Sequence, residues 1–370
     1  MCCWTSVSNV KTSSWTTSVV NTLRRSMIRP AIVLAFLLFI VGCSENATTE
    51  KLSGGIFGTT WNLTYHDAPE GVTREQVETA VVAAFAVVDD SMNNYRSDST
   101  ISRLNTTDAM EVFEVDWDFA LVFNTALDIY YATDGAYDPS VSPLVNLWGF
   151  GPQGVTKRPS ASAIEALEPV VGLDAFAWDL STRAFVKKHG KSELDFSSIA
   201  KGYAVDIASD ALLELGLAHY MLEVGGEIQA QGLSPRGDLW RLAIENPVAG
   251  AGGGVYKAIS VTDVGVATSG DYRNFFIEEG TRYSHLIDPR SSLPIEHDLV
   301  SVTVVHPSTM IADAWATALM VVGTEEALRL ADRYDLGVML ISRGEQQLIS
   351  SHNATMSQWL TTTNGEGSPP

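Results

Sequence analysis

Cysteine is scarce in this sequence. Cys2, Cys3 and Cys43 are the three cysteines among 370 residues, and all of them stand near the N-terminus. The long remainder of the chain therefore has no thiol for a disulfide, for thiol catalysis or for a cysteine metal site. Stability must come from apolar packing, and a chain of this length with 45% hydrophobic residues supplies a sizeable core.

Positive charge is also scarce. The chain has 24 Lys and Arg against 44 Asp and Glu, which gives a formal net charge of -20. Such a surface repels phosphate backbones, so we expect no nucleic-acid partner. An anionic ligand would need a metal ion or oriented backbone dipoles to be bound.

The apolar run "AIVLAFLLFIVG" is about as long as a signal-peptide core and is short for a membrane span. The basic segment "LRRSMIRP" precedes it, and Cys43 follows directly. This arrangement resembles a bacterial lipobox, in which Cys43 is lipidated and becomes the mature N-terminus; a plain signal anchor is the alternative. We therefore interpret residues 1–43 as a signal peptide, with Met27 as an alternative start.

The rest of the chain divides into three parts by composition. Residues 44–54 are polar and are typical of a tether, and residues 351–370 are typical of a disordered tail. Residues 55–350 form one long stretch without internal repeats. We expect this stretch to fold as a single globular domain.

The periodicity of apolar residues predicts an α+β fold with mixed or antiparallel sheet and packed helices. Helices are predicted over 74–92, 117–132, 199–215, 310–321 and 324–334. Strands are predicted at "HYMLEV", "EIQAQG", "LWRLAIE", "KAISVT", "SVTVVH" and "GVMLIS".

The segment "LDFSSIAKGYAVD", residues 194–206, combines a helix start with a positive charge. Asp195, Ser197 and Ser198 precede the apolar positions and are typical capping residues. The N–H groups of a helix N-terminus attract anions, and Lys201 would add a charge one turn further on. The segment predicts an anion site, although a simple capped turn would give the same pattern.

The segment "YSHLIDPR" places His285, Asp288 and Arg290 close together. A histidine near a carboxylate can act as a general base with an acid that orients it. A turn with a solvated histidine is an equally good explanation of this segment alone.

The helix predicted over "MIADAWATALMVVG" carries Asp313 and Thr317 one turn apart, on a face separate from its apolar residues. A carboxylate and a hydroxyl at this spacing suit a hard cation such as Mg²⁺. For the pair alone, a local contact on a solvated face is the more common explanation.

Several such segments occur together and in a fixed order: "GTTW", "YRSDSTISRLN", "GAYDPSVSPLVNLWGFGP", "LDFSSIAKGYAVD", "EVGGEIQAQG", "ATSGDYRN", "YSHLIDPR" and "DAWATAL". In this set the sequence resembles the ApbE family of bacterial flavin transferases, over roughly residues 55–345. The resemblance implies an ApbE-like fold related to the T-fold. It also implies transfer of FMN from FAD to a Thr or Ser of an acceptor protein, with release of AMP.

The resemblance implies roles at the matching positions. Those expected to contact FAD are Phe57, Tyr95, Ala136, Tyr137, Asp138, Asp195, Lys201 and His285, with Phe57 standing where the family usually has Met. The expected Mg²⁺ ligands are Ser198, through its backbone carbonyl, Asp313 and Thr317. On this interpretation the anion is the FAD pyrophosphate, held at the start of the 199–215 helix.

The expected protein is thus a membrane lipoprotein that faces the periplasm. His285 would take the proton from the acceptor hydroxyl, with Asp288 as its orienting acid. The resemblance implies acceptor subunits of membrane redox complexes as partners. Two alternatives stay open: a Mg²⁺-dependent FAD pyrophosphatase, and a non-catalytic lipoprotein that binds FAD.

Overall fold

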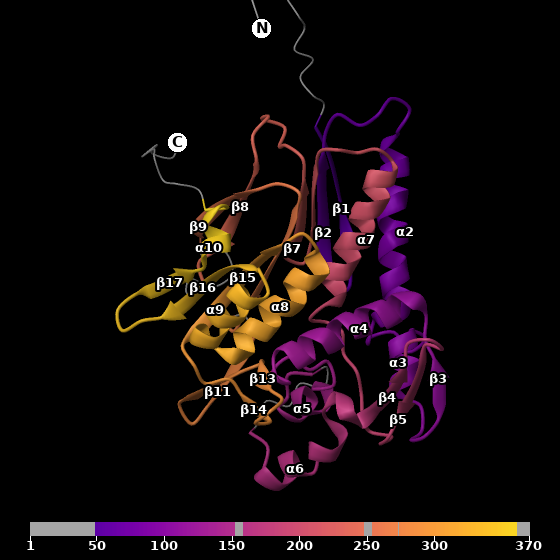
Figure 1. Cartoon of the computed structure of the whole chain (residues 1–370), viewed down its shortest axis with the longest axis vertical. Helices are drawn as coiled ribbons and strands as arrows, with labels where there is room; N and C mark the ends of the chain where they lie inside the picture. The colour runs from indigo at the N-terminus through magenta and orange to yellow at the C-terminus, as the bar shows by residue number, and fades with distance from the viewer. Residues whose placement is uncertain (1–48, 152–157, 248–253, 273, 361–370) are drawn as a thin grey trace, which may run out of the picture. The chain divides into compact units, whose positions relative to one another are not determined.

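An eight-stranded antiparallel sheet is the frame of the protein (Figure 1). The computed structural model describes residues 49–151, 158–247, 254–272 and 274–360. The strand order is β1-β2-β6-β7-β10-β15-β16-β17, and each neighbouring pair is antiparallel. The strands are β1 (Glu50–Ile56), β2 (Thr59–Tyr65), β6 (Tyr220–Val224), β7 (Glu227–Gln231), β10 (Val264–Gly270), β15 (Leu299–His306), β16 (Gly337–Arg343) and β17 (Leu348–His352). The predicted α+β class with antiparallel sheet is confirmed.

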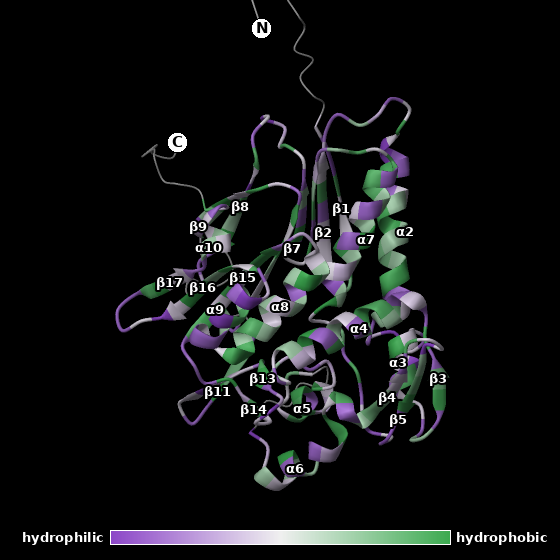
Figure 2. Ribbon diagram, viewed as in Figure 1, coloured by the Kyte–Doolittle hydropathy of each residue, from purple (hydrophilic) through white to green (hydrophobic). Residues whose placement is uncertain are grey.

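Helices cover one face of this sheet, and the long ones lie where apolar periodicity predicts them. They are α2 (Arg74–Met92), α4 (Trp117–Ala132), α7 (Ala200–Glu214), α8 (Thr309–Val322) and α9 (Thr324–Arg333). Helix α2 begins with a capping box in which the Thr73 and Gln76 side chains bond each other's backbone N–H groups. Figure 2 shows hydrophobic and hydrophilic residues alternating along α2 and α7, as expected of helices with one buried face.

The sheet separates two apolar cores because side chains alternate between its faces. On β16, Val338 and Leu340 belong to the core on the helix side, whereas Met339 and Ile341 belong to the opposite core. A hairpin of β8 (Trp240–Glu245) and β9 (Val255–Val261) contributes to this second core. The sheet is therefore buried on both faces and gives the site a rigid base.

Shorter elements fill the connections. They are α3 (Thr100–Asn105), α5 (Ser142–Leu147), α6 (Ala161–Glu165), α10 (Ala354–Ser357), the 3₁₀ turns η1 (Glu168–Val170) and η2 (Leu173–Ala175), and the strands β3 (Val112–Glu114), β4 (Phe176–Asp179), β5 (Ala184–Lys187), β11 (Phe275–Glu278), β12 (Thr281–Ser284), β13 (Ile287–Asp288) and β14 (Leu293–Pro294). The sequence did not predict these elements because such short segments have too few turns or alternations to give a clear period.

Both expected flanking segments are shorter than composition suggested. The tether expected over 44–54 is wrong beyond residue 49, because strand β1 begins at Glu50 and pairs with β2 through backbone hydrogen bonds that polar residues make as well as apolar ones. The disordered tail expected over 351–370 is wrong up to residue 360: β17 and α10 occupy its first part, and Leu360 bridges Ile259. The predicted signal peptide and Cys43 lie outside the described residues.

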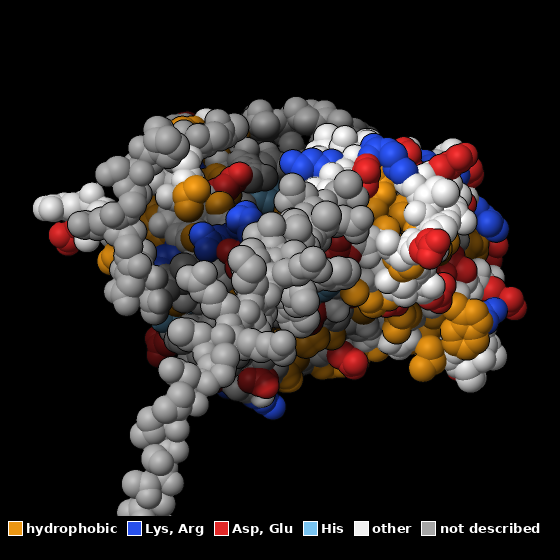
Figure 3. All heavy atoms as spheres, turned by 90° about the horizontal axis from the view of Figure 1, so that it is seen from above, with side chains coloured by type: hydrophobic (Ala, Val, Ile, Leu, Met, Phe, Trp, Pro, Cys, Tyr) orange, Lys and Arg blue, Asp and Glu red, His pale blue; other side chains and the backbone are white. Residues whose placement is uncertain are grey.

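Acidic, basic and hydrophobic side chains are interspersed on the face that Figure 3 shows. Basic side chains are thus present on this face although the net charge of the whole chain is -20. Among the residues that the structure describes, none of the helices is both long enough and apolar enough to cross a bilayer.

Candidate active site

A cavity of about 570 Å³ lies beside the start of α7. Residues from distant parts of the chain line it, and they include Phe57, Tyr95, Asn105, Ser142, Asn146, Asp195, Ser197, Lys201, Asn274 and His285. Five of the residues predicted to contact FAD are in this set. The fold thus brings together Phe57, Tyr95, Asp195, Lys201 and His285, which are far apart in sequence.

The helix start differs from the prediction. The N-cap of α7 is Ile199, which makes no side-chain cap. Asp195 instead accepts a hydrogen bond from the Ser197 N–H at 2.7 Å, and Ser198 donates to the Tyr137 hydroxyl at 3.0 Å. The predicted capping by these side chains is therefore wrong, because the chain makes a tight turn before the helix rather than entering it directly.

The N–H groups of this first turn are also less available than predicted. Ala200 donates to the Phe196 carbonyl at 2.7 Å, and Gly202 donates to Asp313 Oδ2 at 3.1 Å. Positive charge at this junction comes instead from the ammonium of Lys201, which lines the cavity. An anion in the cavity would meet a side-chain cation rather than a row of free backbone donors.

Lys201 lies between two buried carboxylates. Its Nζ is 3.2 Å from Glu227 Oε1 and 3.4 Å from Asp313 Oδ2. Burial lowers the pKa of the Lys201 ammonium, but the charges of the two acids outweigh this effect and leave the pKa above its ordinary value. Burial raises the pKa of Glu227 to about 8, against the opposite effect of Lys201. The lysine therefore stays charged beside the cavity.

Asp313 and Thr317 lie on α8 as predicted, but not on a solvated face. Asp313 is 5% exposed and Thr317 is half-buried, so the alternative of a solvent-exposed contact is excluded. The described residues contain no group of three or more His, Cys, Asp or Glu side chains suited to a metal ion. A site of one carboxylate, one hydroxyl and one backbone carbonyl would not form such a group, and its oxygen donors suit Mg²⁺.

One buried atom supports a cation near this point. Oε2 of Glu227 is buried and has no hydrogen-bond partner among the described residues. Such an oxygen is costly to bury without a partner. Glu227 and Asp313 thus place two buried carboxyl groups within 3.4 Å of the Lys201 ammonium. The chemistry of the donors therefore fits a divalent cation.

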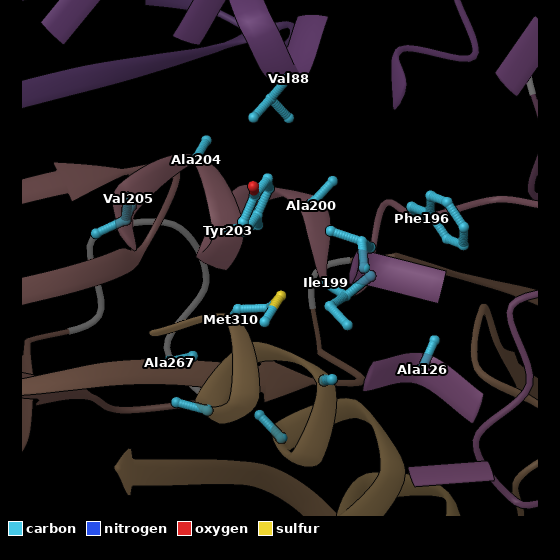
Figure 4. Close-up of a cluster of buried hydrophobic side chains, with 14 of the residues drawn as sticks. Val88, Ala126, Phe196, Ile199, Ala200, Tyr203, Ala204, Val205, Ala267 and Met310 are labelled. Carbon is cyan, nitrogen blue, oxygen red and sulfur yellow. The ribbon is translucent and has the colours of Figure 1, made fainter. Parts of the chain in front are cut away.

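The close contact of α7 with α8 fixes Asp313 in place. Figure 4 shows Tyr203 and Ala204 of α7 between Val88 of α2 and Met310 of α8. Gly202 allows this approach, because a Cβ there would lie 2.4 Å from the Thr309 carbonyl oxygen and 2.8 Å from Asp313 Cβ. The glycine is needed for space rather than for backbone freedom.

We expect Gly202→Ala to destabilise the protein by about 1–3 kcal/mol, the usual cost of inserting a methyl group into a tightly packed contact. Gly190→Ala is the matched control, since its Cβ would meet its nearest neighbour, the Ala109 nitrogen, at an ordinary 3.7 Å. Urea unfolding of the two variants measures the difference. Equal stability would contradict this account of the helix contact.

His285 is held by a backbone carbonyl. Its Nδ1 lies 2.9 Å from the Asn274 oxygen, so Nδ1 carries the proton in the neutral ring and Nε2 has a free lone pair. Burial lowers the pKa of the imidazole, despite the opposite effect of that hydrogen bond. The ring is therefore neutral at neutral pH and able to accept a proton.

Asp288 does not have the expected role beside His285. Its carboxylate binds Arg290 in a bidentate pair, with Nε at 2.9 Å and Nη2 at 2.8 Å. Adjacency in sequence misled the prediction, because the chain turns between His285 and Asp288, where β13 begins at Ile287. The residue that orients the imidazole is Asn274, through its backbone.

Three residues expected to contact FAD do not line the cavity. Ala136, Tyr137 and Asp138 are all buried, and none of them is among the lining residues. Burial raises the pKa of Asp138 to about 6, although Ser140 bonds its carboxylate through both Oγ and N–H. Contact of these residues with FAD stays a prediction.

Sequence reasoning missed two features of the site. Glu227 follows the glycines of "EVGGE", and an acid at the first position of a strand gave no signal of its burial. Asn274 acts through its carbonyl, which any residue at that position would offer. Glu227 could have been suspected because it lies in a recognised segment. The Asn274 carbonyl could not, because every residue has one.

Comparison with known proteins agrees with this arrangement. The model of the ApbE family matches residues 57–340. The chain belongs to the ApbE family. The match includes the ordered segments that the sequence shares with the family and the residues that line the cavity.

Individual ApbE relatives are similar over most of their length. An FAD:protein FMN transferase of Vibrio cholerae is 39% identical, over 84% of this chain and 92% of the relative. One of Haemophilus influenzae is 35% identical, over 92% of this chain and 99% of the relative.

Solved ApbE structures share the fold. The flavin transferase ApbE of Vibrio cholerae superposes with a TM-score of 0.78 at 35% identity, over 85% of this chain and all of the other. The flavinyl transferase ApbE of Pseudomonas stutzeri, in its apo form, has a TM-score of 0.77 at 37% identity, over 85% of this chain and 97% of that one.

Proposed function

We propose that this protein is an FAD:protein FMN transferase that moves FMN from FAD to a Thr or Ser hydroxyl of an acceptor protein and releases AMP. The observation that carries the proposal is the cavity of about 570 Å³, which gathers a neutral His285, a charged Lys201 and the aromatic residues Phe57 and Tyr95. Its membership of the ApbE family and the names of its relatives support the same activity.

The residues suggest how the chain would perform the reaction. The acceptor hydroxyl attacks the phosphorus on the FMN side of FAD, the phosphoanhydride bond breaks, and AMP leaves. His285 Nε2 takes the hydroxyl proton, while the Asn274 carbonyl keeps the other ring proton on Nδ1. The ammonium of Lys201 offsets negative charge on the phosphates.

Magnesium would be held by the Ser198 carbonyl, Asp313 and Thr317. A bound Mg²⁺ would supply further neutralisation of the leaving phosphate without transfer of a proton. The strongly acidic composition makes such a cation more necessary for an anionic substrate. Asp313 supplies a buried carboxylate 3.4 Å from Nζ of Lys201, a residue that lines the cavity, and this supports the assignment.

Release of AMP, measured with and without an acceptor peptide that contains a Thr or Ser, tests the proposal. A transferase releases AMP only with the peptide, which gains the mass of FMN less one water. Release of AMP and free FMN without the peptide would show a pyrophosphatase instead. Binding of FAD without any AMP would show a flavin carrier.

We further propose that the protein is a membrane lipoprotein facing the periplasm, where it reaches flavin-carrying subunits of membrane redox complexes. The lipobox-like "IVGC" ending at Cys43 supports this. Three acyl chains would give stable anchoring, since two or more suffice. Ser44, in place of Asp after the lipidated cysteine, favours the outer membrane where the host has one.

We expect Cys43→Ser to leave an unprocessed precursor, because the modified thiol is the signal for cleavage. The wild type should partition with membranes and incorporate labelled fatty acid. Fractionation and labelling of both forms measure the effect, and Ser44→Ala is the matched control. A wild type that is cleaved elsewhere, unlabelled and wholly soluble would refute the lipid anchor but not the transferase.

A further inference from the structure

Glu227 is a buried acid whose second oxygen has no partner among the described residues. Its side chain is 6% exposed, and Oε1 lies 3.2 Å from Lys201 Nζ. Oε2 is buried without a hydrogen bond. Buried polar atoms are normally paired, so this carboxyl group is unusual among the described residues.

The hairpin between β6 and β7 places this carboxylate. Gly225 and Gly226 form its turn with φ of 63° and 112°, values that favour glycine. A Cβ at Gly225 would lie 2.9 Å from Thr59 Cγ2 and 3.6 Å from Glu227 Oε2. The turn is therefore packed closely against β2, and it directs Glu227 inward toward Lys201.

The charges around Lys201 do not balance. One ammonium faces two buried carboxylates, those of Glu227 and Asp313. In buffer above the pKa of Glu227, which burial raises to about 8, both acids are ionised and one negative charge is left over. If Glu227 were neutral, Lys201 would neutralise Asp313, and an approaching cation would meet no net attraction.

We propose that Glu227 is a positioning residue: it holds Lys201, so that Asp313 remains available to a divalent cation. The inference rests on the magnesium site of the proposed function. When the cation occupies Asp313, Lys201 keeps Glu227 as its counter-charge and stays beside the cavity. Lys201 and the cation can then be present at the same time.

Variants that change the charge of Glu227 or Lys201 test the inference by Mg²⁺ affinity, without a measurement of enzymatic activity. We expect Glu227→Gln to weaken Mg²⁺ binding about tenfold or more, because Lys201 then neutralises Asp313. Lys201→Met should not weaken Mg²⁺ binding, because Asp313 then has no ammonium beside it that competes with the cation. The double variant Lys201→Met with Glu227→Gln restores the single leftover charge, so its Mg²⁺ affinity should return toward that of the wild type.

Isothermal titration calorimetry with Mg²⁺ alone measures these affinities on the full chain without FAD, in a buffer above the pKa of Glu227. Glu223→Gln is the matched control in the same hairpin, because that carboxylate bonds Asn62 and the Gly226 N–H instead. Its Mg²⁺ affinity should equal the wild-type value. Thermal unfolding of each variant shows that it is folded before titration.

Recovery of Mg²⁺ affinity in the double variant distinguishes charge from structure. A purely structural role for Glu227 predicts a double variant at least as weak as Glu227→Gln, and that result would overturn the inference. A wild type that binds no Mg²⁺ would overturn it too. A chain that shows the expected charge pattern but transfers no FMN would leave the inference standing and refute the proposed function.

Discussion

Asp313→Ala is expected to abolish FMN transfer in a protein that remains folded. Asp313 is 5% exposed, and it accepts the Gly202 N–H at 3.1 Å and Lys201 at 3.4 Å. Its replacement removes the one carboxylate among the proposed Mg²⁺ ligands and leaves the helix N–H without its partner. Transfer assays across a range of Mg²⁺ concentrations measure the loss.

Two further variants separate the charge of Asp313 from its place in the fold. Asp313→Asn keeps an oxygen that can accept the Gly202 N–H, so it should restore most of the stability but little of the activity. Thr317→Val should be milder than either, because water can replace one neutral ligand. Asp210→Ala, on the exposed side of α7, is the control and should be fully active. Full activity of Asp313→Ala at low Mg²⁺ would remove the metal assignment.

The long helices α2, α4, α7 and α9 were predictable because each presents an apolar stripe to the core, and α8 because its apolar run is long and is buried on nearly all sides. The stripe of α2, with Val77, Val81 and Val88 buried, repeats at helical spacing over many turns. The strands of the sheet were harder to predict. β1 contains Lys51 and Ser53 on its outward face and carries little apolar signal, so its composition suggested a tether.

In the candidate site, reactive side chains were easier to predict than the groups that orient them. Lys201 and His285, which line the cavity, could be chosen from the sequence because their side-chain chemistry is distinctive and their segments resemble those of a family. The role of Asp313 stays a prediction. The partners of Lys201 and His285 were not predictable, because the partners are set by three-dimensional contact. Asp288 is close to His285 in sequence yet pairs with Arg290, while Asn274 holds the imidazole through its backbone. Sequence patterns indicate reactive groups well, but not the hydrogen bonds that orient them.

His285→Ala should bind FAD and transfer FMN very slowly. The imidazole lines the cavity, and its free Nε2 is the proposed acceptor of the hydroxyl proton. General base catalysis typically contributes ~10²–10⁴-fold, so a loss of that size is expected in the transfer rate with little change in FAD affinity. His352→Ala, at an exposed position on β17, is the matched control. A loss of less than tenfold would limit His285 to binding.

The pH profile of the wild type gives an independent measure of the same role. A base works only when it is unprotonated, so transfer should fall as pH decreases through the pKa of His285. Burial lowers that pKa from its ordinary value of 6.5, so activity should persist at pH 6.5 and decline only in more acidic buffer. Transfer by His285→Ala should lack this acidic limb. An unchanged limb in the variant would assign the titration to another group, and His285 would then not be the base.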